Sequence, residues 1–214
     1  MGVDIGKIEF KPRLRTGDEP LRVLIAASFR EKKGIPYAIE ALARLSNEIP
    51  IYLTIIGDAN YEKDSQLEKQ QILRVLTDSG LQSRTKLLGY QPYEVLLSEA
   101  YQHHIFLHPS VTARDGDNEG GAPVTIIEML ASGMPVVSTL HCDIPEVMGL
   151  ELIQFLSPER NPDALANCIK LLLANNAKGW NKIAKYGRDQ VVKEYNLEVQ
   201  VRALVSHYHD LIKK

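Results

Sequence analysis

The sequence predicts an α/β fold: a Rossmann-like open parallel sheet with helices on both faces. Short apolar runs alternate along the chain with segments whose apolar residues recur at helical spacing. The apolar runs are continuous, which is typical of strands buried on both faces of a parallel sheet. A length of 214 residues is sufficient to bury such a core in a single domain, residues 1–214.

The first half of the chain predicts four strands with helices between them. Leu21–Ser28 is an apolar strand, and the basic turn Phe29–Gly34 leads from it into a helix, Ile35–Ser46, with one apolar stripe. Ile51–Gly57 is the second apolar strand. The elements expected next are a long polar helix, a short strand, a short helix and a fourth strand, at Glu62–Ser79, Lys86–Tyr90, Pro92–Tyr101 and Ile105–Pro109.

The second half predicts two more strands and a helical end. An acidic, glycine-rich loop, residues 115–121, precedes a helix whose first residue is Pro123 and whose end is marked by Gly133. Met134–Ser138 is the next strand, and Asp143 caps a short helix after it. The remaining elements are a weak last strand and three helices, at Glu151–Phe155, Pro162–Ala174, Trp180–Tyr195 and Leu197–Lys213.

Composition and charge exclude several classes of function. The 25 basic and 27 acidic residues nearly balance, and the basic ones are scattered, so no nucleic-acid partner is expected. No apolar run approaches the roughly 20 residues that span a bilayer, and the first residues lack a signal-peptide core. Cys142 and Cys168 stand alone without C-x-x-C spacing, which is typical of free thiols in a reducing cytosol.

Two strand ends carry residues suited to binding a phosphate and a sugar. The helix at Pro123 begins with backbone N–H groups that lack intrahelical partners, at the positive end of the helix dipole. Glu128 lies in the first turns of that helix, where its carboxylate can accept hydrogen bonds from sugar hydroxyls. Arg30 and Lys33 follow another parallel strand, at the edge where ligands bind such sheets. An anion pocket beside a hydroxyl acceptor is the chemistry of a nucleotide-sugar site.

The stretch 118–137, NEGGAPVTIIEMLASGMPVV, resembles the signature of the family 4 glycosyltransferases, retaining enzymes with two Rossmann domains (the GT-B architecture). That signature runs E-G-x-G/P-x-x-x-x-E and then A-x-A-x-G-x-P-V-V. The residues that fit it are Glu119, Gly120, Pro123, Glu128, Ala131, Gly133, Pro135, Val136 and Val137. One extra residue separates the two glutamates, so the helix anchors Glu128 whereas the position of Glu119 stays open.

The resemblance implies that the chain is one half of a GT-B fold, the donor-binding C-terminal domain. Residues 1–20 resemble the interdomain segment G-V-D-x-x-x-F-x-P, although Phe10 comes later than the Phe of that pattern. We therefore expect that the N-terminal acceptor domain is absent from this chain. The final helix, residues 196–214, is expected to cross back towards that domain.

The resemblance also assigns the site residues. Lys33 fits the family's G-R-x-x-x-x-K-G motif, which grips the donor diphosphate; Ser28 occupies the Arg position, and we expect Arg30 to supply the charge. Glu119 faces the donor sugar, where it positions hydroxyls or stabilises the oxocarbenium-like centre, and Glu128 binds the ribose. The other expected substrate-binding residues are Gly120, Gly121, Ala122, Pro123, Val124, Thr125 and Tyr90. Tyr90 either stacks on the nucleotide base or has only a structural role in the turn where it lies.

These residues predict a hexosyltransferase domain for polysaccharide or surface glycan synthesis, inactive on its own. Its expected partners are a nucleotide-diphosphate sugar and the missing acceptor domain. The protein is expected in the cytoplasm, with membrane contact only through the acceptor domain. No cofactor or metal is expected, because the adjacent His103 and His104 point to opposite faces of an extended segment. The alternatives are a non-catalytic nucleotide-binding or regulatory module and a GT-B-like sugar-nucleotide epimerase fragment. The two-glutamate signature favours the transferase.

Overall fold

A computed structural model describes residues 2–212, and its core is a six-stranded parallel sheet in the order β3-β2-β1-β4-β5-β6. The strands are β1 (Leu21–Ala26), β2 (Ile51–Ile56), β3 (Thr85–Leu87), β4 (Ile105–His108), β5 (Val136–Thr139) and β6 (Leu156–Ser157). The strand order reverses between β1 and β4, which pair directly, Val23 with Ile105 and Leu24 with Phe106. Such a switch point is where open α/β sheets bind ligands.

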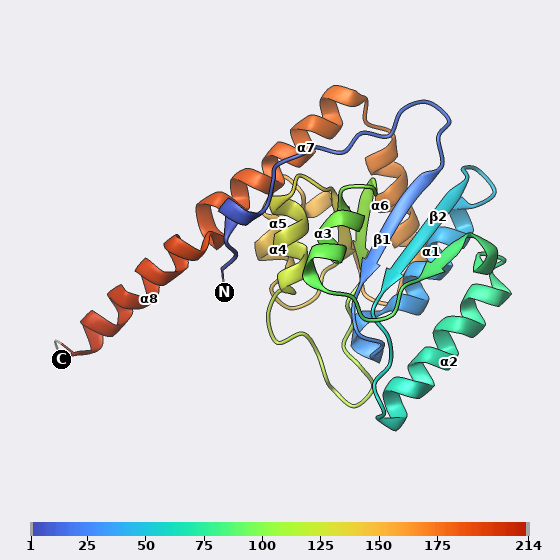
Figure 1. Ribbon diagram of the computed structural model, residues 1–214, viewed down its shortest axis with the longest axis horizontal. Coiled ribbons are helices and arrows are strands. Elements are labelled where there is room, and N and C mark those ends of the chain that lie inside the picture. The colour runs from blue at the N-terminus through green and yellow to red at the C-terminus, as the bar shows by residue number, and fades with distance from the viewer. Residues whose placement is uncertain (1, 213–214) are drawn as a thin grey trace.

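Helices cover both faces of the sheet, as Figure 1 shows. The helices of one face, which pack on one another, are α1 (Ile35–Leu45), α2 (Lys63–Asp78) and α6 (Pro162–Leu173). The helices of the other face are α3 (Tyr93–Ala100), α4 (Val124–Ala131), α5 (Ile144–Met148) and α7 (Ala177–Gln190). This is the distribution that right-handed crossovers on either side of a switch point produce. The predicted fold class is confirmed.

The last strand is not where the sequence predicted it. Residues Ile153–Phe155 of the expected strand form a 3₁₀ turn, and β6 comprises only the next two residues, which pair with Ser138 and Thr139 of β5. Pro158 follows directly and has no backbone N–H to extend the ladder. The expected strand Glu151–Phe155 is therefore wrong in position, although a strand does close this edge.

Two helix starts also differ from the prediction. Pro123 is the N-cap of α4, because its ψ of 130° keeps it extended, so the helix begins at Val124. Helix α7 begins at Ala177 and not at Trp180, because the Asn176 side chain accepts a hydrogen bond from the backbone N–H of Gly179 and caps it there. Both shifts are local and leave the order of elements unchanged.

Two glycines bring the carboxyl ends of the central strands close together. A Cβ on Gly34 would lie 1.9 Å from the carbonyl oxygen of Pro109, and one on Gly57 would lie 1.9 Å from that of Ala27. Both glycines have positive φ, +61° and +126°, a conformation that side chains disfavour. Because only glycine fits, the turn after β1 is pressed against the ends of β2 and β4, where the candidate site lies.

Arg13 ties the N-terminal segment to the α3–α4 face. It is 5% exposed, and its guanidinium donates to the carbonyl oxygen of Ala100 and, at 3.0 Å, to the hydroxyl of Ser132. Its guanidinium also lies 4.6 Å from the centre of the Tyr101 ring. Burial lowers the pKa of Arg13 to about 10, so the side chain remains charged at neutral pH. This segment is therefore packed against the domain.

Helix α8 (Leu197–Ile212) follows α7 through a π-helical turn, Val191–Tyr195, and extends away from the sheet (Figure 1). Its apolar residues Leu204, Tyr208 and Leu211 are 54%, 59% and 68% exposed. These three side chains, on the helix that is expected to cross back towards a further domain, are thus open to solvent in this structure. The predicted end of this helix at Lys213 lies outside the described residues. Within those residues, no helix has the length and apolar character needed to cross a membrane.

Candidate functional site

The candidate site lies at the carboxyl edge of the sheet, around the side chain of Glu119. Lys33, in the turn after β1, donates to both carboxylate oxygens of Glu119, with Nζ–O distances of 2.9 and 2.8 Å. Ser110, after β4, donates its hydroxyl to Oε1 at 2.8 Å. The Lys33 and Glu119 side chains are only 16% and 7% exposed. The structure thus brings the two ends of the predicted site together, although they are far apart in sequence.

This environment keeps Glu119 ionised. Burial raises the pKa of its carboxyl, but the Lys33 ammonium paired with it acts in the opposite direction, and the pKa falls to about 2. His108 is itself 2% exposed, and burial lowers its pKa, so its ring is neutral at pH 7. The centre of the site is therefore a lysine–glutamate ion pair beside a neutral imidazole.

The backbone of Glu119 is held by a second histidine. Its N–H donates to Nε2 of His141 at 3.2 Å, and Nδ1 of the same ring lies 2.6 Å from Oε1 of Glu159. Since the carboxylate accepts, Nδ1 carries the proton and Nε2 is the acceptor for the Glu119 N–H. The side-chain oxygen of Asn118 accepts a hydrogen bond from the backbone N–H of Gly120 at 2.8 Å, which forms a turn around Glu119. These contacts fix the position of Glu119 that the inserted residue had left open.

His108, His141 and Glu159 are the residues that sequence reasoning missed as parts of this site. Nothing in the local sequence connects either histidine with Glu119, which lies 22 positions before His141. The one available signal was position, because both histidines end or follow a strand at the same edge of the sheet.

Arg30 belongs to a separate charged cluster. Its guanidinium lies 3.5 Å from Oδ2 of Asp117, whose Oδ1 pairs with Lys32 at 3.0 Å. The Arg30 side chain is 48% exposed, so it is not held rigidly. Ser28 is half-buried, and its carbonyl oxygen accepts the Arg30 N–H at 3.0 Å. Neither residue joins the contacts of Glu119 in this structure.

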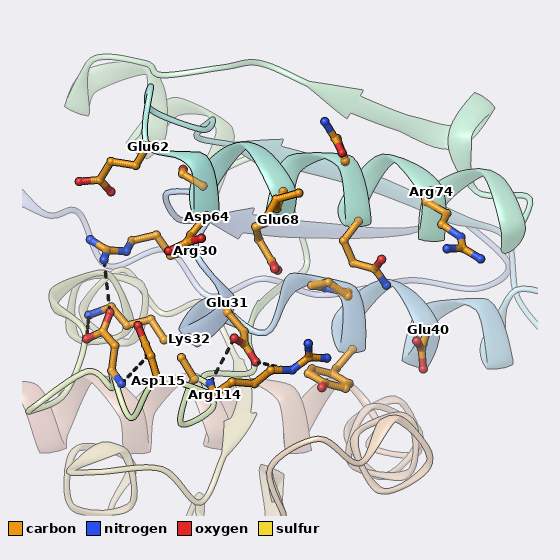
Figure 2. Close-up of a pocket in the computed structure, with 18 residues that line it drawn as sticks. Arg30, Glu31, Lys32, Glu40, Glu62, Asp64, Glu68, Arg74, Arg114 and Asp115 are labelled. Carbon is orange, nitrogen blue, oxygen red and sulfur yellow. Dashed lines mark hydrogen bonds and ion pairs between the residues drawn. The ribbon is translucent and has the colours of Figure 1, made fainter.

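A groove of about 1070 Å³ runs from this cluster between α1 and α2. Figure 2 shows Arg30, Glu31 and Lys32 towards one end of it and Arg74 towards the other. Its walls are mostly charged, and of the predicted site residues it includes only Arg30. The groove is therefore distinct from the Glu119 cluster. We place the site at Glu119 because buried, tightly paired charges at a switch point are better evidence than volume.

Helix α4 presents both free donors and Glu128. The backbone N–H groups of Ala122, Val124 and Thr125 find no acceptor among the described residues, as expected at a helix start. Pro123 lacks an N–H, and Gly121 lies close to Asp143 of the next loop, since a Cβ built on it would be 3.7 Å from a carboxylate oxygen of that residue.

Glu128 lies in a different environment from Glu119. It is half-buried on α4, and burial raises the pKa of its carboxyl. Its neighbour is Tyr93 on α3, whose own pKa is raised to about 12 by burial and by Glu128. Tyr90, three residues earlier, is 60% exposed and donates its hydroxyl to the carbonyl oxygen of Asp58 at 2.7 Å. The Tyr90 ring is exposed, and its contact with a nucleotide base stays a prediction.

The adjacent histidines contact different partners. His103 Nε2 lies 2.8 Å from the hydroxyl of Thr54, whereas Nδ1 of His104 accepts the Arg22 N–H at 3.0 Å. Across the described part of the chain, no group of three or more His, Cys, Asp or Glu side chains is arranged to hold a metal ion.

Comparisons with known proteins identify the family. The family model "Glycosyl transferases group 1" matches residues 6–190. The amylovoran biosynthesis glycosyltransferase AmsK of Erwinia amylovora is 35% identical over 205 residues, which cover 95% of this chain and 48% of that protein. The chain spans about half the length of the curated relatives it matches.

Solved structures agree on the fold. The C-terminal domain of a glycosyl transferase group 1 family protein (LpcC) from Francisella tularensis has a TM-score of 0.72 at 20% identity, covering 92% of this chain and all of that one. Anabaena Alr3699/HepE in complex with UDP-glucose has a TM-score of 0.78 at 21% identity, covering 96% of this chain and 56% of that one. The chain therefore belongs to the glycosyl transferases group 1, and its fold is that of their C-terminal domain.

Proposed function

We propose that this chain is the donor-binding domain of a retaining glycosyltransferase, which transfers a sugar from a nucleotide diphosphate to an acceptor hydroxyl. The observation that carries the proposal is the buried Lys33–Glu119 pair at the switch point of the sheet, next to the free N–H groups of α4. A cation and unpaired backbone donors at one helix start form a site for a diphosphate.

The predicted charged residues and the start of α4 each have a role in this proposal. Lys33 and the N–H groups at the start of α4 stabilise the charge that develops on the leaving diphosphate as the glycosidic bond breaks. Glu119 faces the donor sugar, and Glu128, half-buried beside Tyr93, accepts hydrogen bonds from the ribose. Arg30 is exposed enough to turn from Asp117 to the diphosphate. No metal is required, because these groups supply the positive charge.

The same site and two similar proteins support a proposal for the class of donor. Alr3699/HepE was solved with UDP-glucose, and the name of AmsK assigns it to amylovoran biosynthesis. We therefore propose a UDP-hexose as the first donor to test and a cytoplasmic pathway of polysaccharide synthesis as the setting. The acceptor is expected to enter from a second domain, because sites of this kind lie in the cleft between two domains.

The test is a thermal-shift titration of the chain with UDP, GDP, ADP and NAD. A ligand that binds only the folded state stabilises it by about 2.7 kcal/mol at a hundredfold excess over Kd. We expect one nucleoside diphosphate to raise Tm, and this rise to shrink in Lys33→Ala and Glu128→Ala. Lys185→Ala is the matched control, since the Lys185 side chain is 70% exposed and its ion pair within the described chain is with Asp189 on α7.

A folded sample that responds to none of the four ligands, with and without an added acceptor domain, contradicts the proposal. Transfer of sugar only after the acceptor domain is added distinguishes a transferase from a nucleotide-binding module. Full transfer by this chain alone contradicts the view that it is one half of the enzyme.

A further inference from the structure

His108, the last residue of β4, is a buried polar side chain without a partner. It is 2% exposed, and neither Nδ1 nor Nε2 makes a hydrogen bond within the described chain. Its ring stacks on Phe106 with 5.7 Å between the centroids. Buried polar atoms are nearly always paired, so an unpaired ring at a candidate site needs an explanation.

The ring is aimed at Glu119. Nε2 lies 3.5 Å from Oε1, longer than a normal hydrogen bond but short enough that a small movement closes it. That oxygen is already satisfied, since Lys33 and Ser110 both donate to it. In this state the carboxylate does not need the imidazole.

The charged and titratable groups facing His108 come from three other segments. Lys33 follows β1, Glu119 lies in the loop before α4, and His141 follows β5. The Lys33 ammonium opposes a positive charge on the ring, whereas Glu119 favours one. Together with burial, Lys33 holds the ring neutral while it stays on Glu119.

A bound diphosphate changes this balance, and here the inference rests on the proposed function. A diphosphate at Lys33 brings several negative charges next to Glu119 and competes for the same ammonium. Glu119 is 7% exposed, so its carboxylate cannot turn to water for compensation. Additional negative charge and a carboxylate with a weakened partner both favour the protonated form of a neighbouring histidine.

We propose that His108 takes up a proton from solvent when a nucleoside diphosphate binds at Lys33, and that its Nε2–H then donates to Oε1 of Glu119. The new N–H bond is formed with a proton supplied by the buffer, and no other bond changes. His108 is thus a positioning residue, which holds Glu119 in place at the moment that Lys33 is shared with the ligand.

The test is calorimetry of UDP binding at pH 7 in buffers of different ionisation enthalpy, with GDP or ADP used instead if it gives the larger thermal shift. The dependence of heat on buffer gives the number of protons exchanged. We expect the wild type to take up nearly one more proton than His108→Gln or Glu119→Gln. Protons exchanged by UDP itself contribute equally to all three proteins and cancel in the comparison.

A second measurement needs no variant. The imidazole nitrogen spectrum of the wild type should show one of its six histidines changing from the neutral to the imidazolium pattern when UDP is added. UDP binding with equal proton uptake in wild type and His108→Gln, or with no such spectral change, overturns the inference and leaves the proposed function intact. Failure of all three nucleoside diphosphates to bind, with and without the added acceptor domain, overturns both.

Discussion

Glu119 and Glu128 stand at the two ends of one loop-and-helix segment, and their surroundings shift their pKa values in opposite directions. Burial acts on both carboxyls and raises the pKa of each. For Glu119, the Lys33 ammonium acts against burial, and the pKa falls to about 2. For Glu128, the Tyr93 hydroxyl lowers the pKa by less than burial raises it, so the pKa stays raised.

The difference indicates that the two carboxylates serve different parts of one ligand. Glu119 is part of a charge balance, in which a cation is held ready next to a site for anions. Glu128 lies beside the Tyr93 phenol and forms no ion pair with any of the described residues, which suits it to accept hydrogen bonds from neutral hydroxyls. The segment therefore has a charged end and a hydroxyl-binding end, consistent with diphosphate at one and ribose at the other.

The largest expected effect is at the charged end. Lys33→Met leaves the Glu119 carboxylate buried without its cation, and we expect the free energy of unfolding to fall by about 3 kcal/mol. Urea denaturation measures it. The double variant Lys33→Met/Glu119→Gln removes the uncompensated charge and should recover much of the loss. Equal losses in the single and double variants would show that the pair is not the reason for the effect.

The pH dependence of the free energy of unfolding distinguishes the two glutamates, because their contributions change in opposite directions on acidification. The pKa of Glu119 is depressed from 4.5 to about 2, so its contribution is complete above pH 4.5 and is lost on acidification. Between pH 7 and pH 3 this loss is about 2 kcal/mol. We expect Glu119→Gln to lose less stability than the wild type over this range, by about that amount.

Glu128 has a raised pKa, so protonation of its carboxyl favours the folded state as the pH falls. Glu128→Gln should therefore lose more stability than the wild type on acidification, the reverse of Glu119→Gln. Urea denaturation of the three proteins at pH 7 and pH 3 measures both. If both variants lose more stability than the wild type on acidification, or both lose less, the contrast between the two glutamates is wrong.

The hydroxyl-binding end is tested by the ligand. A hydrogen bond from ribose to an ionised carboxylate contributes about 1.5 kcal/mol, so UDP should bind roughly tenfold more tightly than 2′-deoxy-UDP. Glu128→Gln should lose most of this discrimination, whereas Glu119→Gln should keep it. Isothermal titration of both ligands against the three proteins provides the comparison. Discrimination that survives in Glu128→Gln would place the ribose elsewhere.

Local signals explain how much of this could be predicted from the sequence. Helix α4 was predicted to within one residue of its start, because Pro123 and Gly133 mark its ends and the apolar spacing lies within the segment. Glu128 is fixed by that helix. The strand order could not be read directly, and the weak β6 was misplaced because two residues of pairing leave almost no pattern.

Glu119 depends on contacts that no local pattern encodes. Its partners Lys33, Ser110 and His141 are 86, 9 and 22 positions away, and only the folded sheet brings them to one edge. The sequence placed a cation and a carboxylate in the same site but did not predict that they pair with each other. Nor did it predict that Arg30 would be held by Asp117 and not by the Glu119 cluster.

Arg30 gives the smallest expected effect on stability. Its ion pair with Asp117 is about half exposed, so Arg30→Ala should change the free energy of unfolding by less than about 0.5 kcal/mol. If Arg30 turns to the diphosphate, the same variant should weaken UDP binding several-fold, and more so at low salt, because screening is then weaker. Lys32→Ala is the matched control, since Lys32 pairs with the same Asp117 but is not expected to reach the ligand. Equal weakening by both variants would mean that they act by loosening the acidic loop. The charged end of the site would then rest on Lys33 and the start of α4 alone.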